Sequence, residues 1–188
     1  MSTLETRRDG VTPDLVLRDG SSASIKILRQ EDRAELRKFV DGLSEETLYY
    51  RFLTSGISKD ELLRELLPRS GSYSLVAVRD GVILGLASYI RSGPETAEMG
   101  LIVLDGYQGS GLGTGLTERI ARAANQDGVS MFEAIIDWNN TRMIQLVRNL
   151  GFPTSEKVEP EVIRIRFPTS IDPVSIAEFQ DRWAFTPD

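Results

Sequence analysis

The chain has 188 residues, 40% of them hydrophobic and 27% charged, which is the size and composition of one soluble globular domain. It contains no Cys and no His, so a thiol nucleophile, a Ser-His-Asp triad and a zinc site built from Cys or His are excluded. The net charge of −6 argues against nucleic acid and anionic membranes as partners. The N-terminal residues MSTLETRRDG lack the apolar stretch of a signal peptide, and the run from Val82 to Ile90 is too short to cross a bilayer, so we expect a cytoplasmic protein.

The N-terminal part of the sequence predicts a tail, one strand and a group of helices. Residues 1–20 are polar without a sustained period, so we expect a tail, ending at most in a short strand, before a single domain over residues 21–188 that begins near Ser22. A strand is expected over Ser24–Leu28. Helices are predicted where apolar residues recur at helical spacing: around Leu36, Phe39, Val40 and Leu43, from Ser44 to about Thr54, and around Leu62, Leu63, Leu66 and Leu67.

After Gly71 the hydrophobic period becomes that of strands. Tyr73–Arg79 and Val82–Ile90 flank Asp80-Gly81, a strong hairpin signal, and Ala97–Leu104 reads as a third strand. The remaining predicted elements are a glycine-rich loop, a helix with Leu116, Ile120, Ala123 and Ala124 on one face, a strand over Phe132–Ile136, a helix with Met143, Leu146, Val147 and Leu150, a last strand over Val162–Phe167, and a helix after Asp172-Pro173. This order predicts a mixed α/β (α+β) sheet, with an antiparallel meander before an αβαβ half.

The glycine-rich loop from Tyr107 to Gly115 lies between a predicted strand and a predicted helix. Backbone N–H groups freed of side chains at a helix N-terminus form a cradle for anions. No Lys follows as in a P-loop, and the glycines at 109, 111, 113 and 115 do not give G-x-G-x-x-G. A phosphate or pyrophosphate held by amides remains, and a flexible turn that allows close helix packing is the alternative.

Two motifs in this part of the chain resemble the GCN5-related N-acetyltransferase (GNAT) family. The family's central motif is Gln or Arg, two residues, Gly, one residue, and Gly or Ala, and the sequence reads Gln108-Gly109-Ser110-Gly111-Leu112-Gly113. The family also has an Asn followed eleven residues later by Gly-Phe, and here Asn140 precedes Gly151-Phe152. The resemblance covers about residues 23 to 167 and implies the acyl-CoA N-acyltransferase fold, with the meander splayed away from the C-terminal half.

The resemblance implies acetyl-CoA as cosubstrate and no metal. The pyrophosphate would bind the amides of the loop, and the pantetheine would lie between the third meander strand and the strand ending at Asp137. The backbone of Val103 would polarise the thioester carbonyl, and Asn140 would bind the pantetheine, cap the following helix, or do both. The cofactor-binding residues implied are Ile102, Val103, Gln108, Gly109, Ser110, Gly111, Leu112, Gly113, Thr114 and Asn140.

Acetyl transfer to an amine requires a general base, because an amine with a pKa of about 10.4 is mostly protonated at neutral pH. Glu98 alternates with Met99 and Leu101, so its side chain should point away from the apolar face of its strand. Members of the family that acetylate protein lysines carry Ala-Glu at this place, as Ala97-Glu98 stands here. We therefore predict Glu98 as the base, with Glu133 as the rival and a merely solvated position as the alternative.

The acceptor is predicted less sharply than the cosubstrate. Asn140–Ile144 and Leu43–Phe52 resemble the family branch that acetylates a lysine of acyl-CoA synthetases, so a protein lysine is expected, with a small amine as the alternative. Tyr49, Tyr50, Arg51 and Phe52 would line the acceptor side or pack in the core. The acidic residues Glu156, Glu159 and Glu161 would attract a cation or be solvated surface.

Some features of the sequence depart from this enzymatic interpretation. Many members of the family carry a Tyr seven residues after the Asn to protonate the leaving thiolate, and Val147 stands there, so no general acid is assigned. A non-catalytic acyl-CoA-binding regulatory module is therefore a second hypothesis. A protein for another phosphate-containing ligand is a third, which rests on the glycine loop alone.

Overall fold

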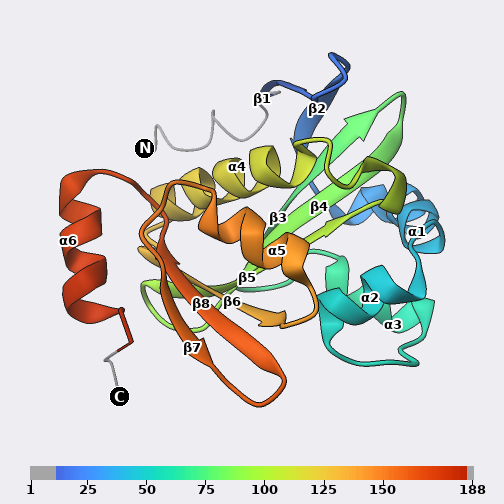
Figure 1. The fold of residues 1–188 in the computed structure, drawn as a ribbon. Helices are drawn as coiled ribbons and strands as arrows, with labels where there is room; N and C mark the ends of the chain where they lie inside the picture. The colour runs from blue at the N-terminus through green and yellow to red at the C-terminus, as the bar shows by residue number, and fades with distance from the viewer. Residues whose placement is uncertain (1–11, 186–188) are drawn as a thin grey trace.

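The computed structural model describes residues 12–185, and these form one eight-stranded sheet with helices on both faces (Figure 1). The strand order is β1-β2-β3-β4-β5-β6-β8-β7, and every neighbouring pair is antiparallel except the parallel pair β5–β6. The strands are β1 (Thr12–Val16), β2 (Ser22–Ile27), β3 (Ser72–Arg79), β4 (Val82–Arg91), β5 (Thr96–Val103), β6 (Met131–Asp137), β7 (Ser155–Val158) and β8 (Val162–Pro168). The predicted mixed fold with an antiparallel meander is confirmed.

Two apolar layers hold the helices against the sheet. The helices are α1 (Arg33–Asp41), α2 (Glu45–Phe52), α3 (Lys59–Leu66), α4 (Leu112–Gln126), α5 (Thr141–Arg148) and α6 (Pro173–Arg182). The first three bury residues such as Leu36 and Leu62 against one face, together with Ile102 of β5. On the opposite face, α4 buries Leu116 and Ile120 against the sheet. The alternating side chains of β5 therefore reach both layers.

Local sequence signals set the ends of several helices. The hydroxyl of Ser44 accepts a hydrogen bond from the Thr47 amide at 3.2 Å and caps α2. Asp172 accepts from the amides of Val174 and Ser175 and caps α6, whose first residue is Pro173. The helix starts predicted from these residues are confirmed, and α2 ends at Phe52 instead of about Thr54.

The structure adds two edge strands that sequence analysis places differently or omits. The sheet begins at Thr12, not near Ser22, because the predicted tail ends in a short strand, β1, that pairs with β2. An edge strand needs only one apolar face, and β1 with its following turn supplies it through half-buried Leu15 and buried Leu17. The other addition is β7, which is polar and pairs only with β8. Its sequence, Ser-Glu-Lys-Val, lacks a hydrophobic alternation.

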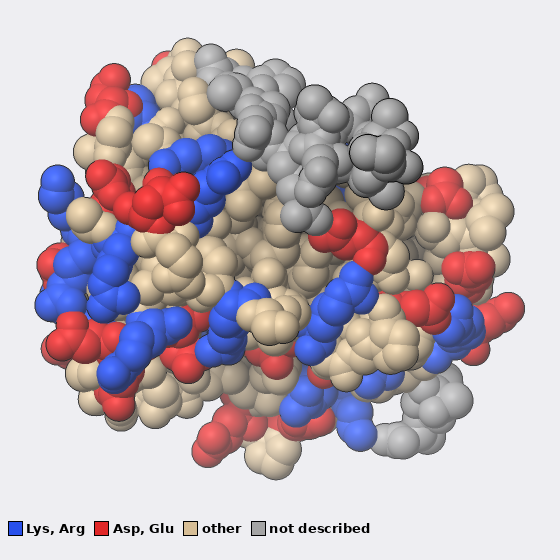
Figure 2. Space-filling model, turned by 180° about the vertical axis from the view of Figure 1, so that it is seen from behind, with Lys and Arg blue, Asp and Glu red and all other residues tan. Residues whose placement is uncertain are grey.

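Surface charge is mixed on the face shown in Figure 2, where basic and acidic side chains are interspersed around uncharged residues. That face has no continuous basic stripe of the kind that binds the phosphates of a nucleic acid duplex. Within the part of the chain that the structure describes, no helix combines the length and apolar character needed to span a membrane.

Candidate active site

The central strands separate and leave half of one strand with an open edge. Strand β5 runs to Val103, but it pairs with β6 only from Thr96 to Glu98, whereas β6 stays paired with β8 as far as Asp137. The second half of β5 therefore has no strand partner on that side among the described residues. A cleft of about 710 Å³ lies at this separation, and its lining includes Met99–Val103 of β5 and Ala134–Ile136 of β6.

The peptide groups at the open edge are directed by the ladder on the other side of β5. The amide of Leu104 donates to the carbonyl of Leu84 at 2.9 Å, so the N–H group of Leu104 points toward β4 and away from the open edge. Because bonds to one neighbour alternate along a strand, the N–H groups of Leu101 and Val103 point to the open edge. The carbonyl of Val103 accepts from Gln108 Nε2 at 3.3 Å, which leaves its N–H directed at the cleft.

The glycine loop meets the cleft at the N-terminus of α4. Gly109 and Gly111 have φ of 77° and 92°, a region that residues with a Cβ rarely adopt, so these glycines fix the course of the loop. The first α-helical bond of α4 runs from the Gly115 amide to the Gly111 carbonyl at 3.1 Å. The amides of the first turn consequently lie at the positive end of the helix dipole, where an anion is favoured.

The structure brings most of the predicted cofactor residues to this cleft. Its lining includes Ile102, Val103, Gln108, Gly109, Gly111, Gly113, Thr114 and Asn140. Ser110 and Leu112 lie in the same loop but are outside the lining. The Ser110 hydroxyl donates to the Tyr107 carbonyl at 2.6 Å, and the Leu112 side chain is fully buried against the sheet. These two residues therefore offer backbone atoms at most.

Asn140 adopts one of its two predicted roles. Its Oδ1 accepts from the Met143 amide at 3.1 Å and caps α5. The residue also lines the cleft beside β5 and β6. Contact with a pantetheine remains a prediction.

Gln108 belongs to a network of hydrogen bonds that connects α2 to the glycine loop. Its Nε2 donates to the Thr47 hydroxyl at 3.0 Å, and its Oε1 accepts from Arg142 at 2.6 Å. Asp105, just before it, accepts from the Ser44 amide and hydroxyl and from the Thr47 hydroxyl at 3.1, 2.6 and 2.8 Å. Partial burial opposes ionisation, but these hydrogen bonds outweigh it and hold the pKa of Asp105 below its ordinary 3.8.

We expect D105N to lower the melting temperature at pH 7, because one acceptor oxygen becomes a donor that faces the donors of Ser44 and Thr47. A loss of about 1.5 kcal/mol corresponds to a Tm decrease of about 3–6 °C. Since the pKa of Asp105 is lowered in the folded state, its stabilisation is complete above the ordinary value and is lost as pH falls through the folded-state value. The Tm difference between D105N and the unaltered protein should therefore shrink toward pH 3, while D181N, an exposed change on α6, should leave Tm unaltered throughout. An equal difference at every pH would contradict this account.

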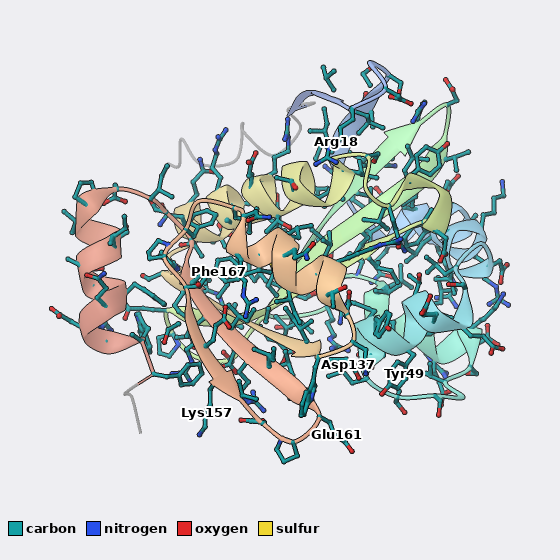
Figure 3. All side chains as sticks on the ribbon, viewed as in Figure 1. Arg18, Tyr49, Asp137, Lys157, Glu161 and Phe167 are labelled. Carbon is teal, nitrogen blue, oxygen red and sulfur yellow. The ribbon has the colours of Figure 1, made fainter. Side chains whose placement is uncertain are left out.

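Arg18 is a candidate phosphate ligand that sequence analysis missed. It lies in the turn between β1 and β2, its amide donates to the Ser110 carbonyl at 2.9 Å, and its side chain lines the cleft beside Gly109 and Gly111 (Figure 3). Four arginines and two glutamates are the charged residues of the lining among residues 12–185: Arg18, Arg51, Arg69 and Arg142, with Glu65 and Glu98. The cleft is therefore net positive in a chain whose net charge is −6.

We expect R18A to weaken acetyl-CoA binding about threefold to tenfold in isothermal titration at low salt. An exposed charge contact of this kind contributes about 1 kcal/mol and is screened by salt, so the defect should shrink at 0.5 M NaCl. R122A removes an exposed arginine on α4 that is not part of the cleft lining, and it serves as the control. If R18A and R122A bind acetyl-CoA with equal affinity, Arg18 does not contribute to acetyl-CoA binding.

The two candidate bases differ in their partners. Glu98 and Glu133 are register partners on β5 and β6. Both oxygens of Glu133 are bound, one by Arg164 at 2.9 Å and the other by Arg166 at 2.8 Å. Glu98 is exposed, lines the cleft, and forms no hydrogen bond or ion pair with any described residue. Of the two carboxylates, Glu98 is thus the one free to accept a proton from a molecule in the cleft.

The residues predicted for the acceptor side divide into two groups. Tyr50, Arg51 and Phe52 line the same cleft as Glu98. Tyr49 lies outside the lining and donates to Asp137 at 3.1 Å, a bond that raises the pKa of its hydroxyl (Figure 3). Val147, at the position where a tyrosine acid is common, is fully buried.

The acidic residues near the last strands are mostly paired. Glu156 accepts two bonds from Arg148 at 2.8 and 2.6 Å, and Glu159 accepts from Arg164 at 2.9 Å. Glu161 is exposed at the tip of the β7–β8 hairpin (Figure 3). Within residues 12–185, no three Asp or Glu side chains gather as a metal ion would require.

Comparison with known proteins agrees with this geometry. A model of the Acetyltransferase (GNAT) family matches residues 38–152. Acetyltransferase PA5475 of Pseudomonas aeruginosa is 29% identical over 144 residues, which cover 72% of this chain and 77% of that protein. The crystal structure of the GNAT domain of S. lividans PAT has a TM-score of 0.76 at 27% identity, covering 83% of this chain and 96% of that one. The structure of yncA from Salmonella typhimurium with its cofactor acetyl-CoA has a TM-score of 0.61 at 23% identity, covering 80% and 95%, and shows the shared fold.

Proposed function

Because the chain belongs to the acetyltransferase (GNAT) family, we propose that it transfers an acetyl group from acetyl-CoA to a primary amine, with Glu98 as general base. The observation that carries this proposal is the juxtaposition at one cleft of an open strand edge, a glycine-rich cradle and an unpaired carboxylate. The open edge offers amides to an extended amide-containing chain, and the cradle offers amides to its phosphates.

The residues divide the binding of acetyl-CoA between them. The first-turn amides of α4 and Arg18 would hold the phosphates, and the N–H groups of Leu101 and Val103 would bind the pantetheine and polarise the thioester carbonyl. Asn140 lines the same cleft. Acetyl-CoA supplies the activated acetyl group, and the chain supplies its position and the base.

The transfer itself needs one base and one leaving group. Glu98 takes a proton from the acceptor ammonium, directly or through one water, and the neutral nitrogen then forms a bond to the carbonyl carbon. As the tetrahedral intermediate collapses, the nitrogen loses its second proton to water, and the carbon–sulfur bond breaks with its electron pair on sulfur. A thiol has a pKa of about 8.5, so water is a sufficient proton source for the thiolate. The reaction therefore does not require a tyrosine acid at the position of Val147.

We propose that the acceptor is the side-chain amine of a protein lysine, with an acyl-CoA synthetase as the target to test first. The support is the resemblance of Leu43–Phe52 and Asn140–Ile144 to the lysine-acetylating branch of the family. The cleft is also lined by Tyr50 and Phe52 on the acceptor side, which would contact the aliphatic stem of a lysine.

The test is incubation of the protein with acetyl-CoA and separate acceptors, following CoA release and acceptor mass. Purified acyl-CoA synthetases and small amines such as spermidine form the panel. An acetyl mass on a synthetase lysine supports the proposal, and acetylation of small amines alone would move the function to metabolite acetylation. Tight CoA binding with no acetylated acceptor would favour a non-catalytic binding module.

A further inference from the structure

Arg51 lines the cleft and lies close to the backbone of Gly100 on β5. It projects from α2, and its Nη2 lies 3.3 Å from the hydroxyl of Ser88 on β4. The guanidinium lies across the backbone of Gly100, where a Cβ at position 100 would overlap it. Gly100 and Ser88 are register partners on β5 and β4, so Arg51 covers the same sheet face that carries Glu98.

The guanidinium has fewer partners than donors. It carries five N–H groups, and its hydrogen bond to Ser88 is the one that it forms with the described residues. Arg51 is partly exposed as a residue, but its Nε is fully buried and has no partner in residues 12–185. Burial lowers the pKa of Arg51, against the opposing effect of the charges of Glu98 and Glu65. A buried N–H group without an acceptor is costly, and the remaining donors of the guanidinium are open to an acceptor from the cleft.

No carboxylate of the described chain fills this need. Glu65 lies 2.7 Å from Arg69, with which it forms an ion pair. Glu98 acts on Arg51 as a nearby charge, without a hydrogen bond to it. The ring of Phe52, 5.0 Å from the guanidinium carbon, covers one side of Arg51 and offers no acceptor atom.

We propose that the acceptor carries a carboxylate, which binds Arg51 and Ser88 while the amine of the acceptor faces Glu98. A carboxylate matches the planar fork of a guanidinium, which an amide or hydroxyl matches less well. Glu98 and Gly100 are two residues apart on one strand, so their Cα atoms are about 7 Å apart and their positions face the same side of the sheet. This spacing suits an amino acid, or a lysine next to Asp or Glu in a polypeptide.

This inference rests on the proposed function only for the role of Glu98, so its test measures binding rather than turnover. Protein saturated with CoA is titrated calorimetrically with two matched pairs of probes. One pair is 4-aminobutyrate and 4-aminobutyramide, and the other is a capped peptide with Lys-Asp and the same peptide with Lys-Asn. If a carboxylate binds Arg51, the acidic member of at least one pair should bind with an affinity about tenfold or more higher than that of its neutral member. The pair that shows the preference identifies the source of the carboxylate.

The variants assign the preference to Arg51. In R51Q, the acidic and neutral members of the preferred pair should bind equally, and R51K should retain part of the preference because it keeps the charge without the fork. S88A is a second variant that preserves the buried cation, and it should reduce the preference about threefold.

The possible results separate this inference from the proposed function. Equal binding of both members to the unaltered protein, a preference that survives in R51Q, or no binding of any probe overturns the carboxylate site. A preference lost in R51Q, together with no acetyl transfer to any acceptor, would leave the carboxylate site standing and contradict the proposed function.

Discussion

Replacement of Glu98 by glutamine is expected to lower kcat/KM for acetyl transfer by about 10²–10⁴-fold at pH 7, the usual contribution of a general base. The variant keeps the size and shape of the side chain and one acceptor oxygen, but it removes the ability of the side chain to take a proton. At higher pH more of the acceptor enters as the free amine, since its pKa is about 10.4. The ratio of the two rates should therefore fall as pH rises, which steady-state kinetics from pH 6.5 to 9.5 would measure.

Glu133 provides a matched control for this experiment, because it is the register partner of Glu98 and the same substitution can be made there. E133Q weakens the ion pairs with Arg164 and Arg166, so we expect a loss of thermal stability. Its kcat/KM should keep the pH dependence of the unaltered protein. If E98Q keeps full activity at pH 7, or if its defect is the same at every pH, Glu98 is not the base.

Replacement of Gly111 by valine is expected to weaken acetyl-CoA binding by tenfold or more. The glycine has a φ of 92° immediately before α4, and a β-branched residue is strongly disfavoured there. Relief of that strain would turn the first-turn amides of α4 away from the cleft. The strain itself costs about 1–3 kcal/mol of folding stability, which thermal unfolding would detect.

A second glycine separates the loss of stability from the loss of binding. Gly128 follows the other end of α4 with a φ of 80°, and a Cβ there would meet no atom within 4 Å. G128V therefore introduces comparable backbone strain far from the cradle. It should lower the stability by a similar amount and leave the affinity for acetyl-CoA unchanged. If both variants lose the same affinity, the effect of G111V reflects general destabilisation, and the cradle is not its cause.

Sequence analysis predicts those parts of the fold that local signals determine. Asp80-Gly81 sets the β3–β4 hairpin, Ser44 begins α2, and the alternation of Glu98 with Met99 assigns opposite faces to them in β5. These features depend on residues close together in the chain. The glycine loop is predicted for the same reason, since its positive φ values and the helix that follows are local properties.

The remaining features arise from contacts between distant segments. Arg18 belongs to a segment predicted as a tail, and only the pairing of β1 with β2 brings it to the glycine loop. The separation of β5 from β6 after Glu98 leaves no local trace, because both strands continue, and only the family resemblance implies it. Arg51 becomes an underpartnered cation only when α2 packs over Gly100, which its own sequence neighbourhood does not indicate.

Hydrogen exchange measured with and without acetyl-CoA would locate the bound molecule on the backbone. We expect slower exchange at the amides of Leu101, Val103 and the first turn of α4, with unchanged exchange in α6. In R18A the protection of that first turn should be weaker at subsaturating acetyl-CoA. Saturating binding that protects other segments and leaves the open edge of β5 unchanged would contradict the assignment of this cleft as the acetyl-CoA site.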